Sequence, residues 1–526
     1  MSANLMQGTN LIEELGRAIG RDQVLTDPAE REFHAMDVYN ALELPLAVVR
    51  PGSTAELQAV VRLAAAAGVA LVPRGGGASY TDGYLPATPN SLLVDTSRLN
   101  RIIEINTEDM YVTAEPGVTW HDLWQALKEK GVRTAFWGPF SGIKATLGGS
   151  ASQNSASLGS GNYGISADAI LGFEIVLANG EILRTGAFAA ANGKPFFRWY
   201  GPDLTGLFCG DAGALGIKAS ISLRLIRTPP FSGAASFGFE TFEQMAAGMA
   251  AVARENVSAD NFGLDPRLQQ GQLGKASAKD AVAAALAVAK TARNPLEAVG
   301  KLVKMAAAGK RFLSGHNYSA HYTVEGVSQG EIKGKLAVLR AAMAPFGQET
   351  ANTIPTVIRA MPFMPLYAVL GPKGERWVPM HGIMPFSKMN EFHAKLSRLY
   401  ADNAARMQQL KVDKGGMFLA INTNAFLYEP VFYWEDDRTL FHNRFLPQEY
   451  LNLLPKYPAN PDGRALVREL RGEIKKVFAS VGAVHMQVGK SYAYMEGRQA
   501  EAARAIREIK RELDPAGIMN PGALQL

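Results

Sequence analysis

The sequence predicts an α+β protein with more than one domain. Its 526 residues exceed what one hydrophobic core usually holds, since domains average about 100–200 residues. Between residues 46 and 131, short apolar segments alternate with helix-like segments. After residues 227–230 (Arg-Thr-Pro-Pro) the composition changes, which marks a domain boundary. Hydrophobic residues at 47% and charged residues at 20% are typical of a globular chain and exclude a disordered one.

The predicted elements follow from local patterns. Ser53 and Glu56 form a capping box at the start of a helix that runs to Ala67 and stops at Gly68. The other expected elements are a helix at 11–25, strands at 46–50, 70–73, 91–95, 102–106 and 111–115, a helix at 119–131, a strand at 171–177 joined by the turn Asn179-Gly180 to a strand at 181–184, and a last helix at 496–513.

Charge and cysteine content exclude several classes. The net charge of +5 comes from interleaved acidic and basic residues, which argues against nucleic acid as a partner. A single cysteine, Cys209, excludes an internal disulfide or a cysteine zinc cluster, and we predict no metal site. The N-terminus has acidic residues where a signal peptide is apolar, and no run approaches ~20 apolar residues. We therefore expect a cytoplasmic protein without a membrane span.

Three glycine-rich elements are candidates for holding an anionic cofactor. Residues 74–80 (RGGGASY) follow a predicted strand, and consecutive glycines let backbone N–H groups converge on a phosphate. The segment lacks both the GK[ST] of a P-loop and the GxGxxG of a Rossmann fold. The second element, 146–154, lies in a Gly- and Ser-rich stretch, 139–164, expected to be a long functional loop. The third is 213–217.

Taken in order, these motifs resemble those of one flavoprotein family. Residues 115–120 (EPGVTW), 163–164 (YG), 203–217 (DLTGLFCGDAGALGI) and 513–522 (LDPAGIMNPG) complete the set. The chain thus resembles the vanillyl-alcohol oxidase/para-cresol methylhydroxylase (PCMH-type) FAD-binding family. The resemblance implies an FAD-binding domain of two α+β subdomains and an α+β cap domain with a sheet over the flavin. The expected limits are 1–230 for the FAD domain, 231–490 for the cap, and 491–526 for a segment that returns to the FAD domain.

The same resemblance implies which residues hold FAD. The first loop would wrap the pyrophosphate, the second would line the cofactor, and the third would lie near the adenine end. The expected cofactor-binding set is Arg74, Gly75, Gly76, Gly77, Ala78, Ser79, Tyr80, Pro139, Thr146, Gly148, Gly149, Ser152, Asn154, Tyr163, Gly164, Gly216, Ile217 and Asn520.

Covalent attachment of FAD is open. Some relatives use a histidine in the first loop, where this chain has Ala78, so that link is excluded. His381, before Pro385 in the cap, is the one plausible linker. It lies one residue closer to the proline than the family pattern, and one residue reverses the face of a strand. His381 is therefore a covalent ligand, an unlinked active-site residue or a structural residue.

His485, His381 and Lys490 are the expected catalytic residues. Phenol-oxidising relatives place a Tyr-Arg pair where this chain has Val484-His485, which disfavours phenolate recognition. An imidazole with a pKa of ~6.5 suits acceptance of a hydroxyl proton. Lys490 would bind an anion or flank the flavin.

The expected function is hydride transfer from an alcohol CH–OH group, of an aromatic or lignin-type compound, or from a para-alkylphenol, to FAD. The alternative is a D-2-hydroxy-acid dehydrogenase of the D-lactate or glycolate type, although the GHxGDGNxH metal motif of those enzymes is absent. A flavin-fold scaffold or electron-transfer subunit is the non-enzymatic alternative. Expected partners are a small-molecule substrate, O2 or a cytochrome-like carrier, and a second copy in a homodimer.

Overall fold

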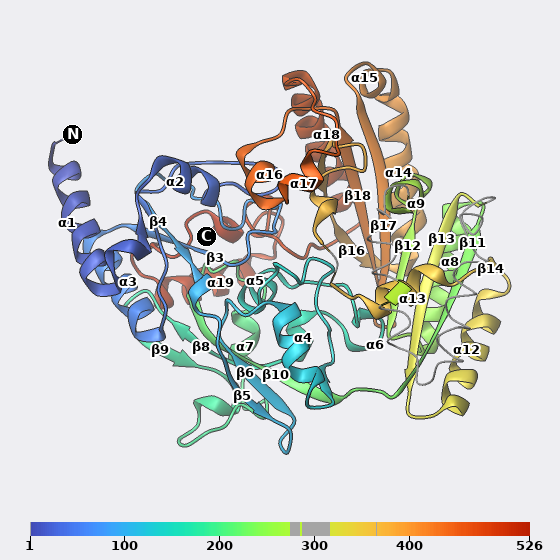
Figure 1. Ribbon diagram of the computed structural model, residues 1–526, viewed down its shortest axis with the longest axis horizontal. Coiled ribbons are helices and arrows are strands. Elements are labelled where there is room, and N and C mark those ends of the chain that lie inside the picture. The colour runs from blue at the N-terminus through green and yellow to red at the C-terminus, as the bar shows by residue number, and fades with distance from the viewer. Residues whose placement is uncertain (1, 274–284, 287–315, 364) are drawn as a thin grey trace. The chain divides into compact units, whose positions relative to one another are not determined.

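The computed structural model describes residues 2–273, 285–286, 316–363 and 365–526, and these form two compact units (Figure 1). Unit 1 consists of Met1–Ser155, Ser166–Thr228 and Met486–Leu526, and unit 2 of Ala156–Ile165 and Pro229–His485. Helices and several sheets occur in the chain, so the predicted α+β class is confirmed. Relative to the expected domain limits, residues 156–165 and 229–230 lie in unit 2, and residues 486–490 lie in unit 1.

Unit 1 contains two sheets. The first has the order β1-β2-β4-β3, with β2, β4 and β3 parallel. The second has the order β5-β6-β10-β8-β9, with β7 paired to β10, and is antiparallel. The strands are β1 (Val24–Leu25), β2 (Ala47–Val49), β3 (Ala70–Arg74), β4 (Ser91–Asp95), β5 (Ile102–Asn106), β6 (Tyr111–Ala114), β7 (Val132–Thr134), β8 (Ile170–Val176), β9 (Ile182–Arg184) and β10 (Ile217–Arg227). The helices are α1 (Ser2–Ile19), α2 (Pro28–His34), α3 (Thr54–Ala67), α4 (Trp120–Lys128), α5 (Leu147–Gln153), α7 (Leu204–Leu207) and α19 (Ala500–Leu513).

The helix α3 shows how sequence sets an element and its packing. Ser53 Oγ accepts a hydrogen bond from Glu56 N at 3.2 Å, and Glu56 Oε2 accepts one from Gly52 N at 2.7 Å. The helix ends at Gly68, whose φ of 62° suits a glycine. Its apolar face joins a core shared by α1, the first sheet, β8, β10 and the C-terminal tail. That tail lies beside β3, because Leu71 exchanges backbone hydrogen bonds with residues 518 and 520.

Two predicted helices have different limits, and a glycine explains each difference. The helix expected at 11–25 ends at Ile19 because Gly20 has a φ of 91°, and Val24–Leu25 forms β1 instead. The last helix was expected from residue 496 but begins at Ala500, after Gly497 with a φ of 75°. In both places a positive φ interrupts the helix.

Unit 2 is built on one antiparallel sheet of eight strands. The order is β14-β11-β13-β12-β17-β18-β15, with β16 also paired to β18. Its strands are β11 (Phe231–Phe239), β12 (Asp260–Leu264), β13 (Tyr318–Gly326), β14 (Gln348–Thr350), β15 (Arg376–Pro379), β16 (Gly382–Pro385), β17 (Val412–Ile421) and β18 (Ala425–Trp434). Its helices include α6 (Ser160–Tyr163), α8 (Phe242–Glu255), α9 (Pro266–Leu273), α12 (Gln329–Met343), α13 (Thr353–Ala360), α14 (Met389–Asp402), α15 (Ala404–Gln409), α16 (Leu440–Phe445), α17 (Gln448–Leu451) and α18 (Pro461–Ser480).

The two faces of this sheet differ in chemistry. On one face, Phe418 and Tyr428 pack against Phe242 of α8, and Phe392 of α14 stacks on Phe478 of α18. Because side chains alternate along a strand, the residues next to Phe418 and Tyr428 point the other way. That second face carries ionisable groups, including His321 of β13 and Glu429 of β18.

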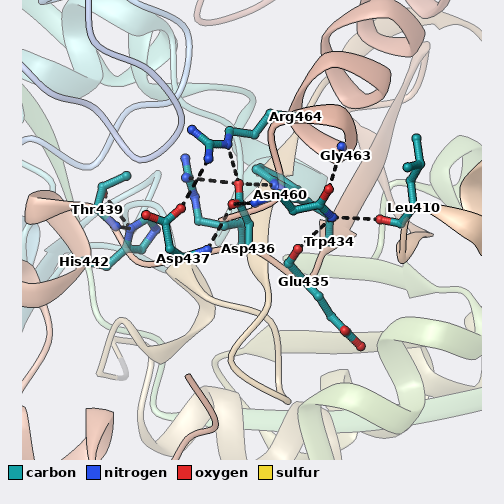
Figure 2. A network of polar contacts seen from close by, with 11 residues as sticks. Leu410, Trp434, Glu435, Asp436, Asp437, Thr439, His442, Asn460, Gly463 and Arg464 are labelled. Atoms are coloured by element: carbon teal, nitrogen blue, oxygen red, sulfur yellow. Dashed lines mark hydrogen bonds and ion pairs between the residues drawn. The ribbon is translucent and has the colours of Figure 1, made fainter. Parts of the chain in front are cut away.

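A buried carboxylate ties the end of β18 to the helix α18 (Figure 2). Asp436 accepts hydrogen bonds from Trp434 Nε1 at 2.9 Å and from Asn460 N at 2.7 Å, and pairs with Arg464 Nε at 2.9 Å. Asn460 in turn caps α18 by accepting from Gly463 N. The network fixes the helix against the sheet, and it explains why a carboxylate with no exposure is tolerated there.

Candidate flavin-binding loops and histidine pair

The loop after β3 presents backbone N–H groups that lack acceptors. In the part of the chain that the structure describes, the N–H groups of residues 76–79 donate no hydrogen bond. These residues are at most partly exposed. Unpaired N–H groups there cost free energy, so a run of them in a glycine loop indicates an anionic ligand.

Close packing explains why this loop has three consecutive glycines. A Cβ at Gly75 would collide with Thr146 Oγ1, and one at Gly76 would collide with the Lys144 carbonyl. A Cβ at Gly77 would meet the Arg74 guanidinium, and its φ is 70°. The structure therefore packs the first predicted loop directly on the second.

The second element forms the short helix α5 rather than the long open loop expected for 139–164. Thr146 caps it by accepting from Gly149 N at 3.2 Å, and Gly148 lies so near Pro116 that a Cβ would be 2.6 Å away. At the other end, the side-chain oxygens of Gln153 and Asn154 are buried without a hydrogen-bond partner among the described residues. Polar atoms of this kind need a ligand or water.

The third element joins the same region through backbone contacts. Gly210 N donates to Ala151 O and Ala212 N donates to Ser152 O, at 2.8 and 2.9 Å. Gly216 has a φ of 152°, and Ile217 is buried where β10 pairs with β8.

Asn520, from the C-terminal tail, connects the first and third elements. Its Nδ2 donates to Gly83 O at 2.8 Å and to Ala212 O at 2.6 Å, and its backbone N donates to Leu71 O. The buried Asn520 amide thus binds two segments that lie more than 300 residues before it in the chain.

Three other residues of the predicted set have structural contacts in unit 1. The Arg74 guanidinium is buried, with its Cζ 5.7 Å from the centroid of the Phe33 ring and 5.3 Å from that of Tyr84. These contacts fix the start of the loop. The Tyr80 hydroxyl accepts from Gln487 Nε2 at 3.5 Å. Pro139 O accepts from Gly142 N at 2.8 Å.

Tyr163 and Gly164 lie in the segment of unit 2 that precedes Ser166. Asp260 of β12 holds this segment, because its Oδ1 accepts from Gly159 N at 2.5 Å. Ser160 O accepts from Asn422 N, and Gly161 N donates to Ala259 O. The sheet of unit 2 therefore positions the segment that carries these two predicted residues.

The two predicted catalytic histidines are neighbours in unit 2. His485 Nδ1 donates a hydrogen bond to the backbone carbonyl of His381 at 2.7 Å. His381 lies between β15 and β16, and the Val484 backbone bridges to Ile383 in β16. The His485 ring also meets Phe478 edge to face. Because a carbonyl only accepts, the neutral His485 carries its proton on Nδ1 and its lone pair on Nε2.

Burial keeps both imidazoles neutral. Desolvation lowers the pKa of His381 to about 3, and His485 adds to the effect. Desolvation also lowers the pKa of His485, although its hydrogen bond to the His381 carbonyl opposes this. A neutral imidazole is the form that accepts a proton.

Lys490 belongs to unit 1, whereas the histidine pair belongs to unit 2. Its Nζ donates to Asn520 Oδ1 at 2.5 Å and to Gly83 O at 3.4 Å. Burial lowers the pKa of Lys490 to about 7, while the charge of Asp82 acts in the opposite direction. These contacts place Lys490 beside residues 81–83, which follow the first loop.

Comparisons with known proteins bear on these loops. The FAD binding domain family matches residues 45–186, and the C-terminal domain family of FAD linked oxidases matches residues 465–524. The solved structure of p-cresol methylhydroxylase with substrate bound has a TM-score of 0.72 and 18% identity, covering 98% of this chain and 96% of that one. The two matched domains and the shared fold support the PCMH-type FAD-binding flavoprotein family expected from the motifs.

Two curated relatives cover shorter parts of the chain. Glycolate oxidase subunit GlcD of Bacillus subtilis is 36% identical over 188 residues, which are 35% of this chain and 38% of that protein. The mitochondrial D-lactate dehydrogenase [cytochrome] of Arabidopsis thaliana is 29% identical over 273 residues, 51% of this chain and 46% of that protein. The chain thus spans less than half the length of these two relatives.

FAD is the cofactor of this PCMH-type flavoprotein, as predicted. The residues present fit it: the N–H groups of 76–79, which have no acceptor among the described residues, suit a pyrophosphate, and the buried oxygens of Gln153 and Asn154 can accept from a polar cofactor. Within the described residues there is no group of three or more His, Cys, Asp and Glu side chains arranged to hold a metal, and no helix has the length and apolarity to cross a membrane.

Sequence reasoning missed Glu429, an acidic side chain on β18, next to the edge strand β15 of the unit 2 sheet. It lies opposite Met417 in the pairing of β17 and β18 and is 9% exposed. Burial raises the pKa of Glu429 to about 8, so it is protonated at neutral pH. A single glutamate within an apolar strand belongs to no recognisable sequence motif. The available signal was one acidic residue within the mostly apolar segment from Phe426 to Trp434.

Proposed function

We propose that this flavoprotein oxidises the CH–OH group of an aromatic alcohol to a carbonyl. The observation that carries the proposal is the hydrogen bond from His485 Nδ1 to the His381 carbonyl. It leaves Nε2 as the basic atom of a half-buried, neutral imidazole. When bound, FAD supplies the acceptor for the hydride that leaves the carbon.

In this proposal His485 takes the hydroxyl proton on Nε2 as the C–H bond breaks. The imidazolium that forms keeps its Nδ1–H bond to the His381 carbonyl, which stabilises the charge. The edge of Phe478 fixes the ring plane. His381 supports the base through its backbone.

We further propose that FAD is held without a covalent bond. The His381 side chain has 0% exposure, and Ala78 stands where relatives carry a linking histidine. Acid precipitation of the holoprotein should leave the yellow colour in the supernatant. A yellow pellet that becomes white in His381→Ala would contradict this.

The alternative, oxidation of a D-2-hydroxy acid, is favoured by the names of the curated relatives and by Arg471. This arginine of α18 is 6% exposed, and its charge acts on His381. A buried guanidinium whose charge reaches His381 would suit a substrate carboxylate.

A substrate panel separates the two. Aromatic alcohols, alkylphenols and D-2-hydroxy acids are mixed anaerobically with the holoenzyme, and bleaching of the flavin is followed. We expect aromatic alcohols to bleach it fastest. Fast bleaching by D-2-hydroxy acids alone, lost in Arg471→Met, would establish the alternative. No bleaching by any member of the panel would contradict both.

A further inference from the structure

A loop of unit 1 exposes four aromatic side chains within five residues. Phe196, Phe197, Trp199 and Tyr200 are 59%, 46%, 60% and 67% exposed, and Leu204 is 43% exposed. They lie between β9 and α7, in the blue-green loop at the lower edge of Figure 1. With about 200 Å² per aromatic side chain, the four rings present about 400–500 Å² of mostly apolar surface. Patches of this size on a protein surface usually have a binding role.

Hydrogen bonds and an ion pair hold the backbone of this aromatic loop in place, so the folded loop itself keeps these rings exposed. Arg198 points inward: its guanidinium makes a two-pronged pair with Asp203, at 2.7 and 3.1 Å, and donates to Ala167 O at 2.6 Å. Phe197 O accepts from Ala187 N at 2.8 Å. The side chains on either side of Arg198 stay largely exposed while the loop is anchored, although the Trp199 ring also contacts the Arg198 guanidinium, 4.7 Å from the ring centroid.

The chemistry of the aromatic loop favours a lipid surface as its occupant. Trp and Tyr are the residues enriched where proteins meet the headgroup region, and Phe inserts beyond it. The charged residues between 187 and 204 are Lys194, Arg198 and Asp203. Since Arg198 and Asp203 pair with each other, exposed Lys194 supplies the net charge, and it is positive. A cation beside interfacial aromatics suits anionic headgroups.

The size of the patch argues against a stable protein interface. A stable dimer buries about 800 Å² on each partner, and the aromatic loop offers roughly half of that. A lipid surface needs no complementary partner and accepts a small protruding group of rings. We propose that this loop docks the protein peripherally on an anionic lipid surface. The proposal is independent of the substrate.

Vesicle binding by the full-length holoprotein tests this. Sedimentation with phosphatidylcholine–phosphatidylglycerol vesicles should pellet the protein, and less should pellet with pure phosphatidylcholine or at high salt. Phe196→Ser/Trp199→Ser should weaken binding about tenfold or more. Val327→Ser/Leu453→Ser, which removes two apolar residues that are 76% and 75% exposed elsewhere, is the matched control and should bind like the parent.

Tryptophan emission gives an independent readout, because Trp199 is the most exposed tryptophan among the described residues. Vesicles should shift its emission to the blue, and Trp199→Phe should abolish the shift while binding persists. Absence of vesicle binding by the parent would overturn the proposal, as would unchanged binding by the Phe196→Ser/Trp199→Ser variant with normal FAD content. A parent dimer that this variant converts to a monomer would assign the loop to self-association instead.

Discussion

At the scale of single residues, burial sets the protonation state of three side chains in unit 2. His381 and His485 lose their charge through burial, and Glu429 keeps its proton for the same reason. A buried base that is already neutral needs no deprotonation before it accepts the substrate proton. The cost is stability, since the Glu429 carboxyl would be ionised in water at neutral pH.

His485→Ala is expected to slow flavin reduction by roughly 10²–10⁴-fold, the usual contribution of a general base, with FAD content unchanged. The pKa of His485 is lowered, so the parent rate should rise with pH through a value below ~6.5 and then level off. Anaerobic stopped-flow reduction across pH measures both. His393→Ala, at a helix-packed histidine bonded to Tyr428, is the control for removing an imidazole. An unchanged reduction rate in His485→Ala would show that another group acts as the general base.

Glu429→Gln should raise stability at neutral pH. The folded pKa of Glu429, about 8, lies above the ordinary value of 4.5, so folding is favoured at low pH. That advantage is lost as pH rises from about 4.5 to about 8, and at pH 7 the deficit is on the order of 3 kcal/mol. Melting temperatures at pH 5 and pH 8 should therefore diverge more in the parent than in Glu429→Gln. Equal divergence in the two proteins would show that Glu429 ionises freely.

At the element scale, what the sequence could predict depended on how local the determinant was. The limits of α3 follow from Ser53, Glu56 and Gly68, which act within one helical turn. Gly20 and Gly497 interrupt helices through their positive φ angles, and the apolar periodicity of the sequence does not predict these angles. The assignment of 156–165 to unit 2 depends on Asp260, about a hundred residues away in the chain, and no local pattern encodes that contact.

The packing of the first glycine loop on the second makes a specific prediction. Gly76→Ala should reduce FAD content about tenfold or more, because its Cβ would occupy the position of the Lys144 carbonyl and push the 76–79 N–H groups away from the phosphate. Gly334→Ala, in α12 with open space around it, is the matched control and should keep full FAD. Absorbance ratios of the purified proteins measure the content. Full flavin loading of Gly76→Ala would show that the loop does not hold the pyrophosphate.

At the scale of the whole molecule, the two units differ in how much of their stability depends on the cofactor. Unit 1 carries unpaired polar groups in its flavin-binding loops, namely the 76–79 N–H groups and the amide oxygens of Gln153 and Asn154. In unit 2, the buried carboxylate Asp436 is bound by side chains and backbone of that unit. Loss of FAD therefore leaves unit 1 with uncompensated groups.

Removal of FAD should lower the melting temperature of unit 1 and leave the core of unit 2 near its original stability. Binding at 100 times the dissociation constant stabilises a fold by about 2.7 kcal/mol, so the shift grows with added FAD. Differential scanning calorimetry of the holo and apo proteins should resolve this as a separation of transitions. Hydrogen exchange should assign the early one, with faster exchange at 75–80 and 146–154 in the apoprotein and little change in β17 and β18. If β17 and β18 lose protection as strongly as the glycine loops, the two units unfold together and FAD supports both.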